Sequence, residues 1–225
     1  METKQWLYEG LDDFPVLRRK LQNFCVDHSL EERPALVWQC IPLDSCEVLL
    51  SSKDLSAALE EGAGDKKDQS GWWYGFRAGQ RPVPVFDGLA AHNGNSDLGW
   101  TTEIHSDGGV IAGLWTFPSV PSQEGTSHLV VSDFHESAFA DFASLATRLF
   151  ATAPIAYPAL VTCTMLNAPM VRFHRNRFRH PVVGPRRNTL QWRVRKADSG
   201  EHVDAVLKLM SAELVRAYGL LPLSA

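Results

Sequence analysis

Positively charged side chains are concentrated in one part of this chain. Residues 172–196 contain nine Arg or Lys residues and no Asp or Glu, whereas the whole chain has 22 basic and 26 acidic side chains. The rest of the chain therefore holds 13 basic side chains against all 26 acidic ones, and a formal net charge of only −4 conceals this segregation. A local field of this kind attracts a polyanion even to an acidic protein.

The residue types in this basic segment, residues 172–196, suit contact with phosphate groups. Phosphate binding needs several cations along one surface, and aromatic rings among them can stack on bases. The candidate binding residues are Arg172, Arg175, Arg177, Arg179, Arg186, Arg187, Arg193, Arg195, Lys196 and Phe178. Near the end of the segment, strand alternation predicts that Leu190, Trp192 and Val194 face one way, with Trp192 in the core. Gln191, Arg193 and Arg195 are then expected to face the other way.

Three interpretations of the basic segment stay open. Its arginines form an outward-facing surface for nucleic acid or another polyanion, they dock on an acidic partner protein, or they are neutralised by carboxylates of the same chain. The first is the preferred hypothesis, and the second is its alternative.

A second set of residues could do acid–base chemistry. Glu103 and His105 are expected on the same side of a strand, with His92 in a nearby loop, and such a set could bind a metal or transfer protons. However, no further His follows at the spacing of metal ligands, so a solvated strand face is the simpler interpretation. His92, Glu103 and His105 are the only catalytic candidates, and we expect no metal and no cofactor.

Motifs of the common enzyme classes are missing from the sequence. The only Glu-x-Lys is Glu2-Thr3-Lys4 at the terminus, which does not suit a metal-dependent nuclease. There is no dinucleotide-binding glycine fingerprint and no Walker lysine motif. An enzyme with a dispersed His/Glu site is therefore only the second alternative.

Apolar periodicity indicates the elements that must position these residues. Helices are predicted over residues 14–28, 51–61, 133–151 and 201–218. Strands are predicted over residues 35–41, 72–76, 83–86, 100–105, 110–117, 127–132, 159–166 and 189–196. Ser106-Asp107-Gly108-Gly109 predicts a tight hairpin turn, because Asp-Gly supplies positive φ angles. Residues 87–99 are predicted to form a long loop, and Pro82 and Pro84 place the strand before it at a sheet edge.

The expected fold is α+β, with a mainly antiparallel sheet and about four helices packed on it. We expect a single domain over residues 1–225, and the alternative is a division into two subdomains near residue 125. The apolar runs are too short to span a membrane, the N-terminus does not look like a secretory signal, and the four cysteines lack the spacing of zinc ligands. The protein is therefore expected to be cytoplasmic with reduced thiols.

A series of segments resembles a known family. PALVWQCIP, GWWYGF, PVFDG, HSDGGVIAGLWTFP and PALVTCTMLNAPMVRF follow one another in order, and AELVRAYGL ends the series. This pattern is similar to the region that follows the DNA-binding domain in bacterial Schlafen-related, AlbA-like proteins. The resemblance implies a regulatory or antiviral defence-associated sensing or adaptor module that acts beside another subunit. It carries over no catalytic residue.

Overall fold

The computed structural model describes residues 10–44, 46–61, 81–92, 99–115, 117, 119–121, 127–131, 134–173 and 182–220. The helices are α1 (Pro15–Asp27), α2 (Lys53–Glu61), α3 (Phe134–Thr152) and α4 (Gly200–Ala217). The large sheet contains β1 (Ala35–Pro42), β2 (Val83–Val85), β3 (Gly88–His92), β4 (Trp100–His105), β5 (Val110–Leu114), β8 (Ala159–Leu166), β10 (Thr189–Gln191) and β11 (Arg195–Ala197). A small sheet contains β6 (Ser119–Pro121), β7 (Ser127–Val131) and β9 (Val171–Phe173). The predicted α+β fold is confirmed.

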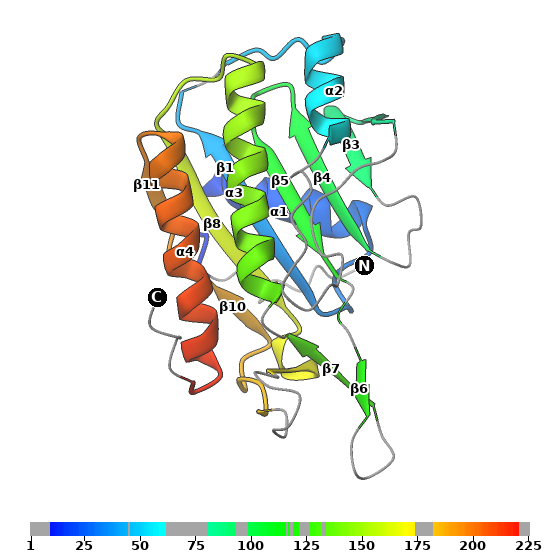
Figure 1. Cartoon of the computed structure of the whole chain (residues 1–225), viewed down its shortest axis with the longest axis vertical. Helices are drawn as coiled ribbons and strands as arrows, with labels where there is room; N and C mark the ends of the chain where they lie inside the picture. Colours follow the sequence, from blue (N-terminus) through cyan, green and yellow to red (C-terminus); the bar gives the residue numbers. More distant parts are fainter. Residues whose placement is uncertain are drawn as a thin grey trace.

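The large sheet is antiparallel and is covered by helices on both faces. Its strand order is β10-β8-β1-β5-β4-β3-β2, and β11 also pairs with β8. Figure 1 shows α3 and α4 lying side by side across the front of the sheet and α1 behind it. All eight residues of β1 are buried, because this strand lies near the middle of the sheet with helices on either side.

Side chains of β1 alternate between two hydrophobic cores. Leu36, Trp38 and Cys40 enter the core beneath α2, α3 and α4, whereas Val37 and Ile41 enter the smaller core beneath α1. The fully buried Trp38 meets Phe139 and Phe142 of α3 with ring centroids 5.2 and 6.2 Å apart. Offset and edge-on aromatic contacts of this kind add to the stabilisation from apolar burial. Among the described helices, none has the length and apolar character that crossing a membrane requires.

The predicted hairpin around Asp107 and Gly108 is confirmed, but its turn differs in type. The Gly108 N–H donates to the His105 carbonyl at 2.9 Å, and the His105 N–H donates to the Gly109 carbonyl at 2.9 Å. Only Gly108 has a positive φ, of 80°, whereas a two-residue Asp-Gly turn would need two such residues. The loop therefore has three residues, with glycine at the left-handed position.

The prediction of a long loop over residues 87–99 is wrong for its first half. Gly88–His92 forms β3, which pairs with both β2 and β4, and residues 93–98 lie outside the described residues. Gly and Ala, which make up three of its five residues, have weak strand propensity. This strand therefore forms because it pairs with a neighbour on each side. The prediction that β2 is an edge strand is confirmed.

The pairing of β10 and β11 with β8 contains one extra residue. Gln191 lies opposite Thr164, whereas Arg195 lies opposite Val161, so residues 192–194 face residues 162 and 163. Such a β-bulge reverses the side-chain faces that follow it. The predicted alternation is therefore right for Leu190 and Trp192, which join the larger core. It is wrong for the residues after the bulge, because Val194 packs against the α1 core and Arg195 contacts α4.

Replacing Gly108 with Ala is expected to lower the free energy of unfolding by about 2–3 kcal/mol. The new Cβ would lie 2.5 Å from the Cys46 Sγ, and φ at this position is 80°. Gly219→Ala is the matched control, because φ is 70° there but no atom lies within 4 Å of the added Cβ. That variant should lose only about 1 kcal/mol. Urea unfolding measures the free energy of unfolding of both variants. The difference between their losses is the steric cost of the contact with Cys46, and equal losses would contradict that cost.

Candidate functional site

The structure describes only part of the basic segment. Arg175, Arg177, Phe178 and Arg179 lie outside the described residues, so their predicted contacts stay predictions. Arg172 lies on β9 and is half-buried. The remaining candidates follow Val182 and lie on or beside β10 and β11.

Two of these candidates are neutralised by carboxylates of the same chain. Arg195 pairs with Glu213 of α4 at 2.7 Å, and Lys196 pairs with Asp198 at 3.2 Å. Arg195 reaches α4 because the bulge turns it to that face of the sheet. The expectation of an unpaired cationic surface is therefore wrong for Arg195 and Lys196.

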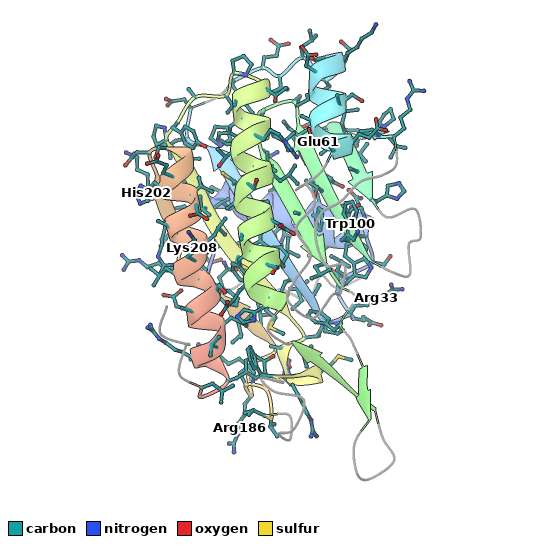
Figure 2. All side chains as sticks on the ribbon, in the orientation of Figure 1. Arg33, Glu61, Trp100, Arg186, His202 and Lys208 are labelled. Carbon is teal, nitrogen blue, oxygen red and sulfur yellow. The ribbon has the colours of Figure 1, made fainter. Side chains whose placement is uncertain are left out.

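Three other arginines remain exposed. Arg186, Arg187 and Arg193 are exposed, and none of them forms an ion pair with a carboxylate in the described part of the chain. In Figure 2, Arg186 projects outward from the end of the molecule below α4. For these three side chains, the prediction of exposed and uncompensated positive charge agrees with the described part of the structure.

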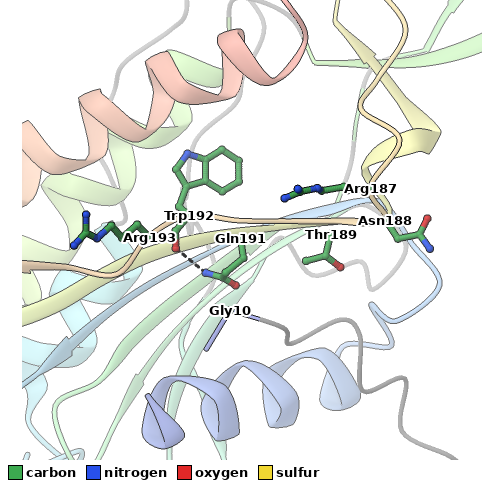
Figure 3. Close-up of a pocket in the computed structure, with 7 residues that line it drawn as sticks. All are labelled: Gly10, Arg187, Asn188, Thr189, Gln191, Trp192 and Arg193. Atoms are coloured by element: carbon green, nitrogen blue, oxygen red, sulfur yellow. Dashed lines mark hydrogen bonds between the residues drawn. The ribbon is translucent and has the colours of Figure 1, made fainter. Parts of the chain in front are cut away.

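A pocket of about 740 Å³ lies between two of these arginines. Its described lining residues are Gly10, Arg187, Asn188, Thr189, Gln191, Trp192 and Arg193. Figure 3 shows Arg187 and Arg193 toward opposite ends of this stretch, with Thr189 and Gln191 between them. No described residue of the lining is acidic, and we call this feature the Arg pocket.

The wall of the Arg pocket is held rigidly from behind. The Gln191 Nε2 donates to the Thr162 Oγ1, the Cys163 carbonyl and the Trp192 carbonyl at 2.9–3.1 Å, while its Oε1 accepts from the Thr164 hydroxyl at 2.7 Å. The Thr189 Oγ1 is buried and has no hydrogen-bond partner among the described residues. A buried polar atom without a partner is costly unless a ligand or water satisfies it.

Trp192 anchors the same strand in the core, as predicted. Its side chain is 6% exposed, and its Nε1 donates to the Met210 carbonyl of α4 at 2.9 Å. The backbone N–H of Trp192 donates to the Cys163 carbonyl at 3.0 Å. Its indole is therefore fixed by packing and by hydrogen bonds, and it is not a free stacking platform.

The hairpin candidates Glu103 and His105 are brought together, with two partners that sequence reasoning missed. The Glu103 carboxylate accepts from the His28 Nε2 at 2.8 Å and from the His105 Nε2 at 3.0 Å. The Lys20 Nζ lies 3.1 Å from the His105 Nδ1 and 2.9 Å from the Asp107 Oδ2. We call these five residues the Glu103 network.

Electrostatics favour an ionised carboxylate at the centre of this network. Burial alone would raise the pKa of Glu103, but hydrogen bonds from His105 and His28, and their charge when protonated, lower it to about 2. Burial likewise opposes ionisation of Asp107, while Lys20 and the Gly109 N–H lower its pKa. Both carboxylates therefore stay charged at neutral pH.

The geometry of the Glu103 network suits a clamp better than a catalytic site. Both oxygens of Glu103 and both ring nitrogens of His105 are already occupied by neighbours within the network. His92 lies on β3 opposite Thr101, so it shares the sheet face of Glu103 but belongs to a different strand. No group of His, Cys, Asp or Glu in the described ranges is arranged to hold a metal ion.

One signal in the sequence could have revealed Lys20. It follows Leu17 by three positions and precedes Phe24 by four, so it lies on the apolar face of α1. A lysine on such a face needs a buried partner, because burial of an unpaired ammonium is costly. His28 continues the same face four residues after Phe24, and its ring stacks on Trp115 at 5.6 Å.

Comparisons with protein-family models, curated proteins and solved structures find no significant match to this chain. The resemblance to Schlafen-related, AlbA-like proteins therefore stays a prediction.

Replacing Glu103 with Gln is expected to lower the free energy of unfolding at pH 7 by on the order of 3 kcal/mol. The pKa of Glu103 lies below its unfolded value, so its stabilisation is full above about pH 5 and is lost as the pH falls from about 4.3 toward about 2. Urea unfolding across this pH range should show wild type and variant converging toward acid.

Asp204→Asn is the matched control for this prediction. Its carboxylate pairs with Lys208 at 2.6 Å on the exposed side of α4, where an ion pair contributes little. This variant should follow the wild-type pH curve. A constant difference between wild type and Glu103→Gln down to pH 2.5 would contradict the role of the ionised carboxylate.

Proposed function

We propose that the protein is a non-catalytic binding module whose basic segment contacts nucleic acid or another polyanion. The observation that carries the proposal is the Arg pocket, where Arg187 and Arg193 are exposed and no described lining residue is acidic. Arg186 lies beside it and adds a third cation. Cations on one surface, uncompensated by nearby carboxylates, supply the salt-dependent attraction that polyanion binding requires.

The lining residues also supply groups that bind phosphate or sugar oxygens. Arginine guanidinium groups form paired hydrogen bonds with phosphate, and Asn and Thr side chains are common donors to the nucleic acid backbone. Asn188 is exposed and lines the Arg pocket. This combination supports the proposal beyond charge alone.

The broader biological role is proposed on the resemblance. We place the protein as a regulatory or defence-associated module that acts beside another subunit in the cytoplasm, a role that a binding surface would serve. All four cysteines are free, which agrees with a reducing compartment. The first alternative is that the same surface docks on an acidic protein.

Arg187→Ala/Arg193→Ala is expected to weaken binding to a mixed-sequence oligonucleotide and to reduce its salt dependence. If five cations of the basic segment contact phosphates, the log–log slope of affinity against salt is about −3.5 to −4.5. Loss of two contacts should make the slope shallower by about 1.4–1.8. Gel shifts across a salt series, with single-stranded and duplex oligonucleotides, measure both effects.

Lys53→Ala/Lys208→Ala is the matched control for this experiment. It removes the same total charge from exposed positions on α2 and α4, outside the lining of the Arg pocket. This variant should retain the wild-type slope. Equal losses in the two double variants would show that only net charge matters, and unchanged binding in Arg187→Ala/Arg193→Ala would remove the proposed site.

A further inference from the structure

The wall of the Arg pocket is an edge of the large sheet as far as the structure describes the chain. β10 stands at one end of the strand order, and β8 is its only neighbour among the described strands. The Trp192 N–H donates to the Cys163 carbonyl, so the backbone groups of Trp192 and, two residues earlier, Leu190 point toward β8. The N–H and C=O groups of Thr189 and Gln191 consequently point away from the sheet.

Within the described ranges of the chain, no strand pairs with these outward groups. No described residue forms a backbone hydrogen bond with the N–H or C=O of Thr189 or Gln191 on that side. Edge strands with unpaired groups accept extended peptides, and natural proteins protect them with proline, charge or a covering element. At the opposite edge, β2 is interrupted by Pro84, whereas β10 contains no proline.

The charges beside β10 determine which strand it would accept. In a symmetric antiparallel pair of two β10 strands centred on Leu190, Arg187 of each copy would lie opposite Arg193 of the other. Like charges directly opposite each other are destabilising, so this register of a second copy is disfavoured. An acidic strand would instead place carboxylates against both arginines.

The two arginines lie on either side of β10. Arg187 precedes Thr189 by two positions and Arg193 follows Gln191 by two positions. A partner strand that pairs with Thr189 and Gln191 would therefore need an acidic residue on each side of its paired residues to meet both guanidinium groups. The Arg pocket provides about 740 Å³ beside this edge for side chains of the added strand.

We infer that the β10 edge takes an extended acidic segment of a partner protein as an additional antiparallel strand, with carboxylates bound by Arg187 and Arg193. The inference rests on the proposed anionic partner and specifies its class as a protein. Main-chain hydrogen bonds to Thr189 and Gln191 supply affinity, and the flanking arginines supply selectivity.

The test uses a capped, rhodamine-labelled peptide, Asp-Thr-Val-Thr-Val-Thr-Asp, and the full-length protein in fluorescence anisotropy. A second peptide replaces both Asp residues with Lys, and a third keeps them but has two consecutive central prolines, which remove main-chain donors in either register. Wild type should bind the first peptide and lose at least about tenfold in affinity for the other two.

The reciprocal experiment reverses the two charges in the protein. Arg187→Glu/Arg193→Glu should no longer bind the acidic peptide and should instead bind the lysine peptide. The control variant Lys53→Glu/Lys208→Glu should bind both peptides as wild type does. Amide hydrogen exchange should show protection of Thr189 and Gln191 upon binding of the acidic peptide. Gain of the lysine peptide shows that the reversed variant is folded.

Three results would overturn the inference. Equal affinity for the prolyl peptide would show that no strand is added, and unchanged acidic-peptide binding in the reversed variant would exclude the two arginines. Salt-dependent oligonucleotide binding without any peptide binding would leave the proposed polyanion function standing and make the partner a nucleic acid. Absence of both kinds of binding would remove the proposed function as well.

Discussion

Three residues of the chain, Trp192 to Val194, lie opposite only two residues of β8, and this bulge is held by the indole of Trp192. The ring is buried against α3 and α4, and its Nε1 donates to the Met210 carbonyl. Burial of a whole indole is worth several kcal/mol, far more than any surface ion pair nearby. Burial of Trp192 in the core therefore determines on which side of the sheet each neighbouring arginine lies.

The bulge therefore separates the arginines in and beside it into exposed and ion-paired ones. Arg193 stays exposed beside the Arg pocket, while Arg195 crosses to the other face and pairs with Glu213. A regular strand would have placed both guanidinium groups on one face, where they would have repelled each other. The bulge thus leaves a smaller but uncompensated positive surface, and it strengthens α4 with a partly buried ion pair.

The Glu103 network makes a different contribution, because it fixes α1 against the sheet. A helix whose apolar face contains Lys20 needs an anionic partner beneath it, and the hairpin supplies one in Asp107. Glu103 then orients two imidazoles from separate elements. A partly buried hydrogen-bonded network of this kind specifies one arrangement of the helix on the strands.

Much of the fold could be predicted because apolar spacing records which face of each element is buried. The four helices, β1, β8 and the hairpin around Gly108 follow from local pattern alone. β3 could not be predicted, because its small residues become a strand only through pairing with β2 and β4. The bulge could not be predicted either, because Thr-Leu-Gln-Trp-Arg-Val-Arg alternates between polar and apolar residues without a break. For the site, composition indicated where cations gather, but the partner of Arg195 is 18 residues away and is brought close only by the fold.

The two edges of the large sheet differ in chemistry, and this difference bears on the stoichiometry of assembly. Copies that joined edge to edge in an open-ended series would bring β2 of one molecule against β10 of the next, in a heterologous contact. Pro84 removes a donor from β2, so that contact lacks part of its ladder. If β10 accepts a foreign strand as we propose, the sheet is lengthened at that side, while Pro84 disfavours growth into a fibre from the other side. A protein built this way favours finite complexes over open-ended polymers.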